Sequence, residues 1–184
     1  WRWSLRSAAG LLAQMTVWIG YIQWLRENGF GFPPEPILQP LKNIVCKDAI
    51  LAFNEAGEPI EPEWPSVSTI VGNPPFLGGN RIRAELGDEY VDAIFQLYAN
   101  RVPAFADLVC YWFEKARVMV QVGHTQRVGL LATQGIRGGA NRRVLERIKE
   151  TGDIFWAQSD REWVLNGAMV HVSMIGFDKG LERL

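Results

Sequence analysis

The sequence predicts an α/β fold with a mostly parallel sheet, helices on both faces and an antiparallel last strand. Short apolar, β-branched runs alternate with segments whose apolar residues recur at helical spacing. Such alternation is typical of parallel strands that are joined by covering helices. Residues 153–159 and 168–177 follow each other with no helical segment between them. We therefore expect these two strands to pair as an antiparallel hairpin.

The composition is that of a globular domain with no bias toward polyanions. The 184 residues are enough for one compact domain with a real core. The net charge is −1, so any DNA affinity has to come from a local patch or another domain. Cys46 and Cys110 are too few for a disulfide framework, and we expect two reduced core cysteines of a cytosolic protein. No signal peptide or membrane span is predicted.

Residues 1–65 are predicted to contain one helix and one strand. Apolar residues at helical spacing predict a helix over residues 4–28, with Ser4 suited to cap it and Gly29 to end it. We expect its apolar face to pack against a core. A strand is predicted over residues 41–46, and a loop rich in proline and glutamate over residues 54–65.

Glycine and proline mark the ends of most elements in the rest of the chain. Apolar β-branched runs predict the strands, and helical spacing predicts the helices. Phe105 and Phe113 lie on the apolar face of one such helix, and we expect both in the core. The expected elements are strands 67–72 and 127–133, helices 83–100, 104–121 and 141–150, and a glycine-rich loop 134–139.

The motif Asn73-Pro74-Pro75-Phe76 follows the strand predicted over residues 67–72. Two successive prolines exclude both ladder hydrogen bonds and continuation as a helix. The result is a rigid, extended corner at the carboxyl end of a strand, where open α/β sheets bind their ligands. This corner is suited to bind a planar base that carries an exocyclic amino group, because it offers an amide, two fixed carbonyls and one aromatic ring. This interpretation requires that packed side chains do not bury the corner.

The corner resembles the catalytic motif of S-adenosylmethionine-dependent amino-methyltransferases, chiefly the DNA adenine enzymes. The chain is most similar to the methyltransferase region of MmeI-like fused restriction–modification proteins. This resemblance implies a class I methyltransferase (Rossmann-like) fold, S-adenosyl-L-methionine as cofactor, and double-stranded DNA with a flipped adenine as substrate. It also implies a bacterial, cytoplasmic protein and no metal.

The resemblance covers nearly all of residues 1–184, but only the later part of a methyltransferase domain. The first strands and the glycine-rich cofactor loop of the family have no counterpart here. We therefore expect a fragment of a longer protein, whose missing N-terminal part completes the cofactor pocket and makes the active species.

The resemblance assigns the methyl-transfer chemistry to the corner. The Asn73 side-chain carbonyl and the Pro74 backbone carbonyl would accept hydrogen bonds from the amino group of the target base. Both acceptors would be held in place in advance by the proline pair, Pro74 and Pro75. Phe76 would stack on the base once it has left the duplex.

Five further residues have roles under the resemblance, each beside a plainer alternative. Asp48, at a strand end, would bind the adenine amino group of the cofactor, or is a solvated loop residue. Asp107 would line the cofactor pocket, or complements the dipole of its helix. Trp163 would be the second aromatic face on the flipped base, or packs in the core. Arg137 and Arg142 would contact DNA phosphates, or are solvated surface arginines.

Two other functions stay open from the sequence. Similar Asn-Pro-Pro-aromatic corners methylate RNA adenine or the side-chain amide of protein glutamine, and the near-zero net charge does not separate these substrates. The chain is alternatively an inactive, truncated module that packs against partner chains.

Overall fold

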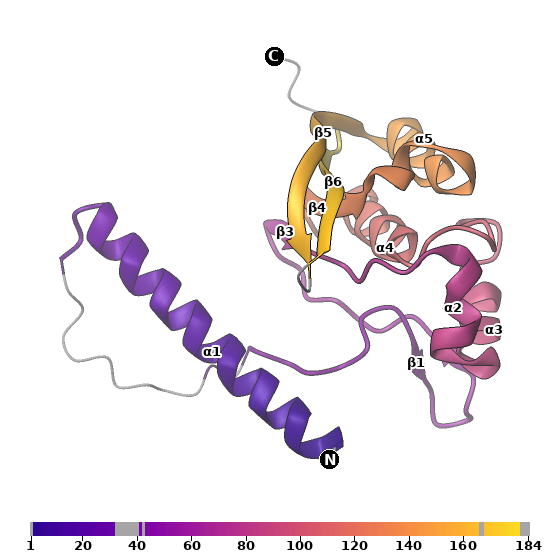
Figure 1. Ribbon diagram of the computed structural model, residues 1–184, viewed down its shortest axis with the longest axis horizontal. Coiled ribbons are helices and arrows are strands. Elements are labelled where there is room, and N and C mark those ends of the chain that lie inside the picture. Colours follow the sequence, from indigo (N-terminus) through magenta and orange to yellow (C-terminus); the bar gives the residue numbers. More distant parts are fainter. Residues whose placement is uncertain (1, 32–40, 42, 166–167, 181–184) are drawn as a thin grey trace. The chain divides into compact units, whose positions relative to one another are not determined.

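The structure is a computed structural model, and its described residues form two compact units, 1–48 and 49–184, which are treated separately. Figure 1 shows one long helix in the first unit and a sheet with helices against it in the second. The described residues are 2–31, 41, 43–165 and 168–180.

The first unit consists mainly of helix α1, Arg2–Glu27, which confirms the helix predicted over residues 4–28. At its end the Asn28 side-chain amide donates to the Trp24 carbonyl at 2.8 Å. Leu11 and Leu12, on the apolar face that was predicted to pack against a core, are 62% and 64% exposed, so that packing is not found within this unit.

The strand predicted over residues 41–46 is also wrong for the residues described there. Residues 41 and 43–46 form a turn and irregular chain. A strand needs a hydrogen-bonded neighbour, and the described part of this unit contains no second strand to supply one. Asp48 is the last residue of the unit and is exposed.

The second unit opens with a short hairpin of β1, Ala52–Phe53, and β2, Pro59–Ile60. The Asn54 side chain shapes its turn by accepting hydrogen bonds from two backbone amides in the loop. The loop predicted over residues 54–65 therefore contains a strand. Tyr98 anchors the segment before the hairpin to the core, since its hydroxyl donates to the Ile50 carbonyl at 3.0 Å.

The main sheet has four strands in the order β3-β4-β6-β5. Strand β3 pairs with β4 in parallel, whereas β6 lies between β4 and β5 and is antiparallel to both. The expected antiparallel last strand is thus confirmed. Three strands share one direction, as predicted, but the position of β6 makes the sheet mixed, with a single parallel pair. The strands are β3 Thr69–Gly72, β4 Arg127–Thr133, β5 Asp153–Leu165 and β6 Ala168–Asp178.

The hairpin of β5 and β6 is longer than the sequence predicts. Residues 160–165, expected as loop, continue β5 and pair with the first part of β6. The strand is irregular, with register shifts between Ile154 and Trp156 and between Gln158 and Arg161. Antiparallel pairing with β6, interrupted at these two shifts, supplies backbone hydrogen bonds that the polar composition of the segment does not reveal.

The helix predicted over residues 83–100 is two helices, α2 Gly79–Leu86 and α3 Asp88–Leu97. Gly87 separates them with φ +86°, a backbone conformation that glycine adopts without steric cost. The direction of the chain therefore changes at Gly87, and the two helices pack against each other.

Helix α4, Val109–Gln121, begins five residues later than predicted, and α5, Arg142–Thr151, matches its prediction within a residue. Between β4 and α5 the expected glycine-rich loop forms two 3₁₀ turns, η1 Gln134–Arg137 and η2 Gly139–Asn141. Phe105 precedes α4 and is 79% exposed, so its predicted core position is wrong, whereas Phe113 is fully buried.

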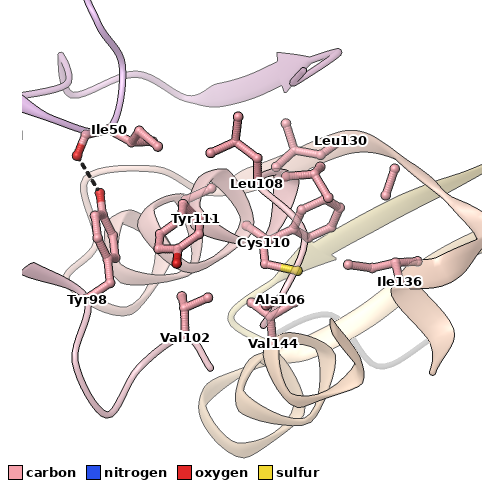
Figure 2. Close-up of a cluster of buried hydrophobic side chains, with 14 of the residues drawn as sticks. Ile50, Tyr98, Val102, Ala106, Leu108, Cys110, Tyr111, Leu130, Ile136 and Val144 are labelled. Carbon is pink, nitrogen blue, oxygen red and sulfur yellow. Dashed lines mark hydrogen bonds between the residues drawn. The ribbon is translucent and has the colours of Figure 1, made fainter. Parts of the chain in front are cut away.

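The core of the second unit lies between α4, α3, the 3₁₀ turns and one face of the sheet (Figure 2). Tyr98 and Tyr111 meet edge to face at its centre, with ring centroids 5.1 Å apart. Cys110 is buried beside them as expected, but Cys46, in the first unit, is exposed and is not a core residue.

Helices cover one face of the sheet in the described second unit, so the expectation of helices on both faces is not met there. Figure 1 shows α4 and α5 on the same side of the sheet. On the other face Val71 lies beside Gly129, and Phe155 lies over Gly176. Val71 is 77% exposed and Phe155 is half exposed.

Candidate active site

The Asn-Pro-Pro-Phe corner begins where β3 ends and leaves the sheet at the carboxyl end of the strand. Asn73 is exposed, Pro74 is buried, and Phe76 is half-buried. Within the described part of the chain the Asn73 amide makes no hydrogen bond. The corner is thus held by its proline and its aromatic ring, while its amide is available to a ligand.

The segment that leaves the corner is fixed against the approach to α4. The Leu108 backbone N–H donates to the Leu77 carbonyl at 2.9 Å, and the Gly79 N–H donates to Asp107 Oδ1 at 2.9 Å. Gly79 lies so close to this segment that an added Cβ would stand 2.2 Å from the Phe105 carbonyl oxygen. Both ends of the corner are therefore anchored, one in the β3 ladder and the other on the residues before α4.

Asn141, which the sequence analysis did not single out, joins this anchor to the loop after β4. Its Oδ1 accepts from the Asp107 backbone N–H at 2.7 Å. Its Nδ2 donates to Asp107 Oδ2 at 2.9 Å and to the Gly135 carbonyl at 3.2 Å. The Cys110 thiol also contacts Asn141 Oδ1, at 3.5 Å. An asparagine just before a helix suggests an N-cap, but this side chain makes no capping bond and is buried instead.

The two predicted cofactor residues have different surroundings. Asp107 is half-buried, and each of its carboxylate oxygens accepts one hydrogen bond, from Gly79 and from Asn141. A carboxylate oxygen has two acceptor positions, so Asp107 retains capacity toward a ligand. Asp48 belongs to the first unit, where it is exposed.

The predicted phosphate-binding arginines line a groove of about 710 Å³ beside α5. Arg137 is ion-paired with Asp160 at 3.1 Å, and Arg142 with Glu146 at 3.2 Å. Asn73 is not among the residues that line this groove. The arginines are therefore partly neutralised, and a phosphate has to compete with carboxylates for them.

Trp163 lies in β5 opposite Val170, so it belongs to a strand rather than to the predicted loop. Its side chain lies outside the described part of the structure. Trp156 in the same strand is about half exposed.

A buried ionic cluster fixes α5 to α4 and so supports the loop that carries Asn141. Glu114 is fully buried and accepts two hydrogen bonds from each of Arg117 and Arg147, at 2.8–3.2 Å. Burial alone raises the pKa of the Glu114 carboxyl, but the bonds from the two arginines outweigh it and hold the pKa below its ordinary value. Glu114 is therefore a buried carboxylate that is fully compensated.

Neither nucleophilic thiol chemistry nor a metal centre is indicated in the described residues. Burial, with a smaller contribution from the charge of Asp107, raises the pKa of the Cys110 thiol to about 12. No group of three or more His, Cys, Asp or Glu side chains suited to a metal ion occurs among the residues described. The helices described are also too short or too polar to cross a membrane.

An α/β unit with an Asn-Pro-Pro-Phe corner at a strand end, whose asparagine is exposed, has the features of a methyltransferase domain. The family model of the MmeI DNA-methyltransferase domain matches residues 12–183, and the chain belongs to this family. The predicted resemblance to MmeI-like proteins is thereby confirmed.

A solved structure of the type IIL restriction–modification enzyme MmeI in complex with DNA is also similar. The two share 25% sequence identity with a TM-score of 0.49, over 64% of this chain and 16% of that chain. This chain thus matches only a small part of that enzyme. No curated protein gives a match.

Proposed function

We propose that this chain is the catalytic part of an adenine-specific DNA methyltransferase of a restriction–modification enzyme. The observation that carries the proposal is the proline-stiffened corner at residues 73–76, with Asn73 exposed, in a chain of the MmeI DNA-methyltransferase family. The β3-β4-β6-β5 order with its reversed β6 supports a class I, Rossmann-like fold.

The corner would act on the amino group of the target base by accepting hydrogen bonds. The lone pair of that nitrogen is delocalised into the purine ring, which makes it a weak nucleophile. Acceptance of both N–H bonds, by Asn73 Oδ1 and the Pro74 carbonyl, favours the pyramidal nitrogen on which the lone pair is localised. Pro74 is buried, so its position is fixed, whereas Asn73 is exposed, so its side-chain amide is accessible. Pro75 keeps the corner extended, and Phe76 offers its ring to the base.

S-adenosyl-L-methionine would supply an electrophilic methyl group. Asp107 fits such a cofactor in residue type, because it is a half-buried carboxylate with unused acceptor positions that suit a hydroxyl or amino group. Asp48 would bind the amino group of its adenine. We infer that further cofactor contacts come from a preceding part of the same protein.

On the substrate side, Arg137 and Arg142 would bind phosphates of double-stranded DNA, and Trp163 would face the flipped base. Because both arginines are ion-paired, their release from Asp160 and Glu146 would be coupled to DNA binding. Two phosphate contacts would make the binding constant fall with salt with a log–log slope of about −2.

A label-transfer assay on the intact protein tests the function. The protein is incubated with methyl-labelled S-adenosylmethionine and, separately, with duplex DNA, structured RNA or a glutamine-rich protein. We expect label in DNA, released as N6-methyladenine on digestion. Label only in RNA or protein would replace the substrate class, and label in none of the three would support an inactive interaction module.

A further inference from the structure

We propose that Asn141 is a positioning residue for the methyl-transfer reaction, which fixes the corner at residues 73–76 through Asp107. The expected effect on the reaction rests on the proposed function, whereas the hydrogen bonds of Asn141 do not depend on that function. Asn141 is buried and would touch neither the base nor the cofactor.

The hydrogen bonds of Asn141 require an amide in one orientation. The Oδ1 atom receives the Asp107 backbone N–H, so this atom has to be an acceptor. The Nδ2 atom faces the Asp107 carboxylate and the Gly135 carbonyl, so this atom has to be a donor. Only an asparagine amide supplies both at this side-chain length. Aspartate, which is nearly identical in shape, would place a second carboxylate against Asp107.

The effect of Asn141 on the corner passes through two short hydrogen bonds. Asn141 holds Asp107 Oδ2, and Asp107 Oδ1 holds the Gly79 N–H, at 2.9 Å in each case. Gly79 is the first residue of α2 and ends the segment that follows Phe76. The direction of the Pro74 carbonyl depends on both ends of the corner being fixed, one by β3 and the other by this chain of bonds. A shift of about 1 Å in a reacting group is enough to lower a rate about 100-fold.

The same network meets the loop after β4, since Asn141 also holds the Gly135 carbonyl. A Cβ on Gly135 would stand 3.3–3.6 Å from Thr133, Asp107 and Asn141, so the three segments are closely packed here. Asn141 is thus the point at which the loops after β3, before α4 and after β4 are joined.

The test uses Asn141→Asp in the intact protein, with Asn80→Ala as control, because Asn80 is exposed on α2. The titratable groups in contact with position 141 are Asp107 and Cys110, while Gly135 adds only a carbonyl. We expect Asn141→Asp to lower kcat about 100-fold near pH 8 with little change in DNA affinity. Its activity should recover as the pH falls, because two facing carboxylates come to share a proton that replaces the lost donor. The control should keep the wild-type rate and pH profile.

Hydrogen exchange at the Gly79 amide provides a readout that needs no activity. We expect Asn141→Asp to reduce protection of this amide about tenfold, the equivalent of one charged hydrogen bond. The exchanged pair, Asn141→Asp with Asp107→Asn, restores a donor facing an acceptor between positions 107 and 141, although not the bond to the Gly135 carbonyl, and should recover part of the protection. The double variant also provides the test if Asn141→Asp alone fails to fold.

The outcomes separate this inference from the proposed function. Unchanged Gly79 exchange in Asn141→Asp, or no recovery in the exchanged pair, would overturn the positioning role whatever the activity. Altered exchange with a wild-type kcat would also overturn it. If the wild-type protein transfers no methyl group but Asn141→Asp still reduces protection of the Gly79 amide, the link from Asn141 through Asp107 to Gly79 stands and the proposed reaction is refuted.

Discussion

The sharpest structural prediction compares two adjacent glycines that follow the corner, Gly78 and Gly79. A Cβ on Gly79 would lie 2.2 Å from the Phe105 carbonyl oxygen, about 0.8 Å closer than the 3.0 Å below which real Cβ contacts essentially never fall. On Gly78 the nearest atom, Asp107 Oδ1, would be 3.7 Å away, an ordinary contact. The backbone of Gly78 is extended with φ −66°, which alanine adopts freely.

Gly79→Ala therefore has to move the segment by most of an ångström. A movement of 0.8 Å would stretch the 2.9 Å bond from Gly79 to Asp107 beyond hydrogen-bonding distance. Overpacking costs about 1–3 kcal/mol and the charged hydrogen bond about 1.5–3 kcal/mol. The better helix propensity of alanine offsets about 1 kcal/mol. We predict a net loss of about 1.5–5 kcal/mol, which is about 5–15 °C in Tm for a unit of this size.

Thermal unfolding by circular dichroism or calorimetry measures this difference, with methyl transfer by the intact protein as a second readout. Gly78→Ala should leave both unchanged or raise Tm slightly, since it restricts the unfolded chain. Equal Tm values and equal activity for the two variants would refute the claim that the residues after the corner are clamped against Phe105.

Three further predictions concern buried groups, and the second and third compare each with a matched residue. Glu114→Gln should cost about 3–5 kcal/mol near neutral pH, because it leaves the buried Arg117 and the half-buried Arg147 without the carboxylate that they share. Because the pKa of Glu114 is lowered in the folded protein, its carboxylate stabilises the fold at pH values above its pKa in the unfolded chain. The difference in unfolding free energy between wild type and Glu114→Gln, measured in urea, should therefore narrow as the pH falls below about 4. Tyr111→Phe should be neutral or stabilising in the same assay, since this buried hydroxyl has no partner among the described residues, whereas Tyr98→Phe should lose about 1 kcal/mol with its hydrogen bond. An alkylating reagent near pH 7.5 should modify exposed Cys46 and spare buried Cys110; rapid loss of both thiols in the folded protein would contradict this.

The sequence predicted best those elements whose signal is local. Residues 127–133 form β4 within the predicted bounds, because an apolar β-branched run between polar turns can only be a buried strand here. The corner at residues 73–76 is likewise determined by proline chemistry, which acts on its immediate neighbours alone.

The errors arose where distant parts of the chain decide the outcome. The strand predicted over residues 41–46 has no partner in the described part of its unit, and residues 160–165 became strand because β6 pairs with them. Gly87 divides a helical pattern that apolar spacing alone makes continuous. Asn141 was missed because it stands at the start of the helix predicted over residues 141–150, where no local pattern marks it, and only the folded chain shows its side chain turned inward to Asp107.

The most direct test of the catalytic role of the corner is the rate of methyl transfer to duplex DNA by Asn73→Ala in the intact protein. The matched control is Asn80→Ala, an exposed asparagine on the neighbouring helix. We predict a loss of about 100-fold or more for Asn73→Ala, with folding and DNA affinity retained, because one preorganised acceptor of the amino group is removed. Wild-type transfer by Asn73→Ala would contradict the assignment of the chemistry to this corner.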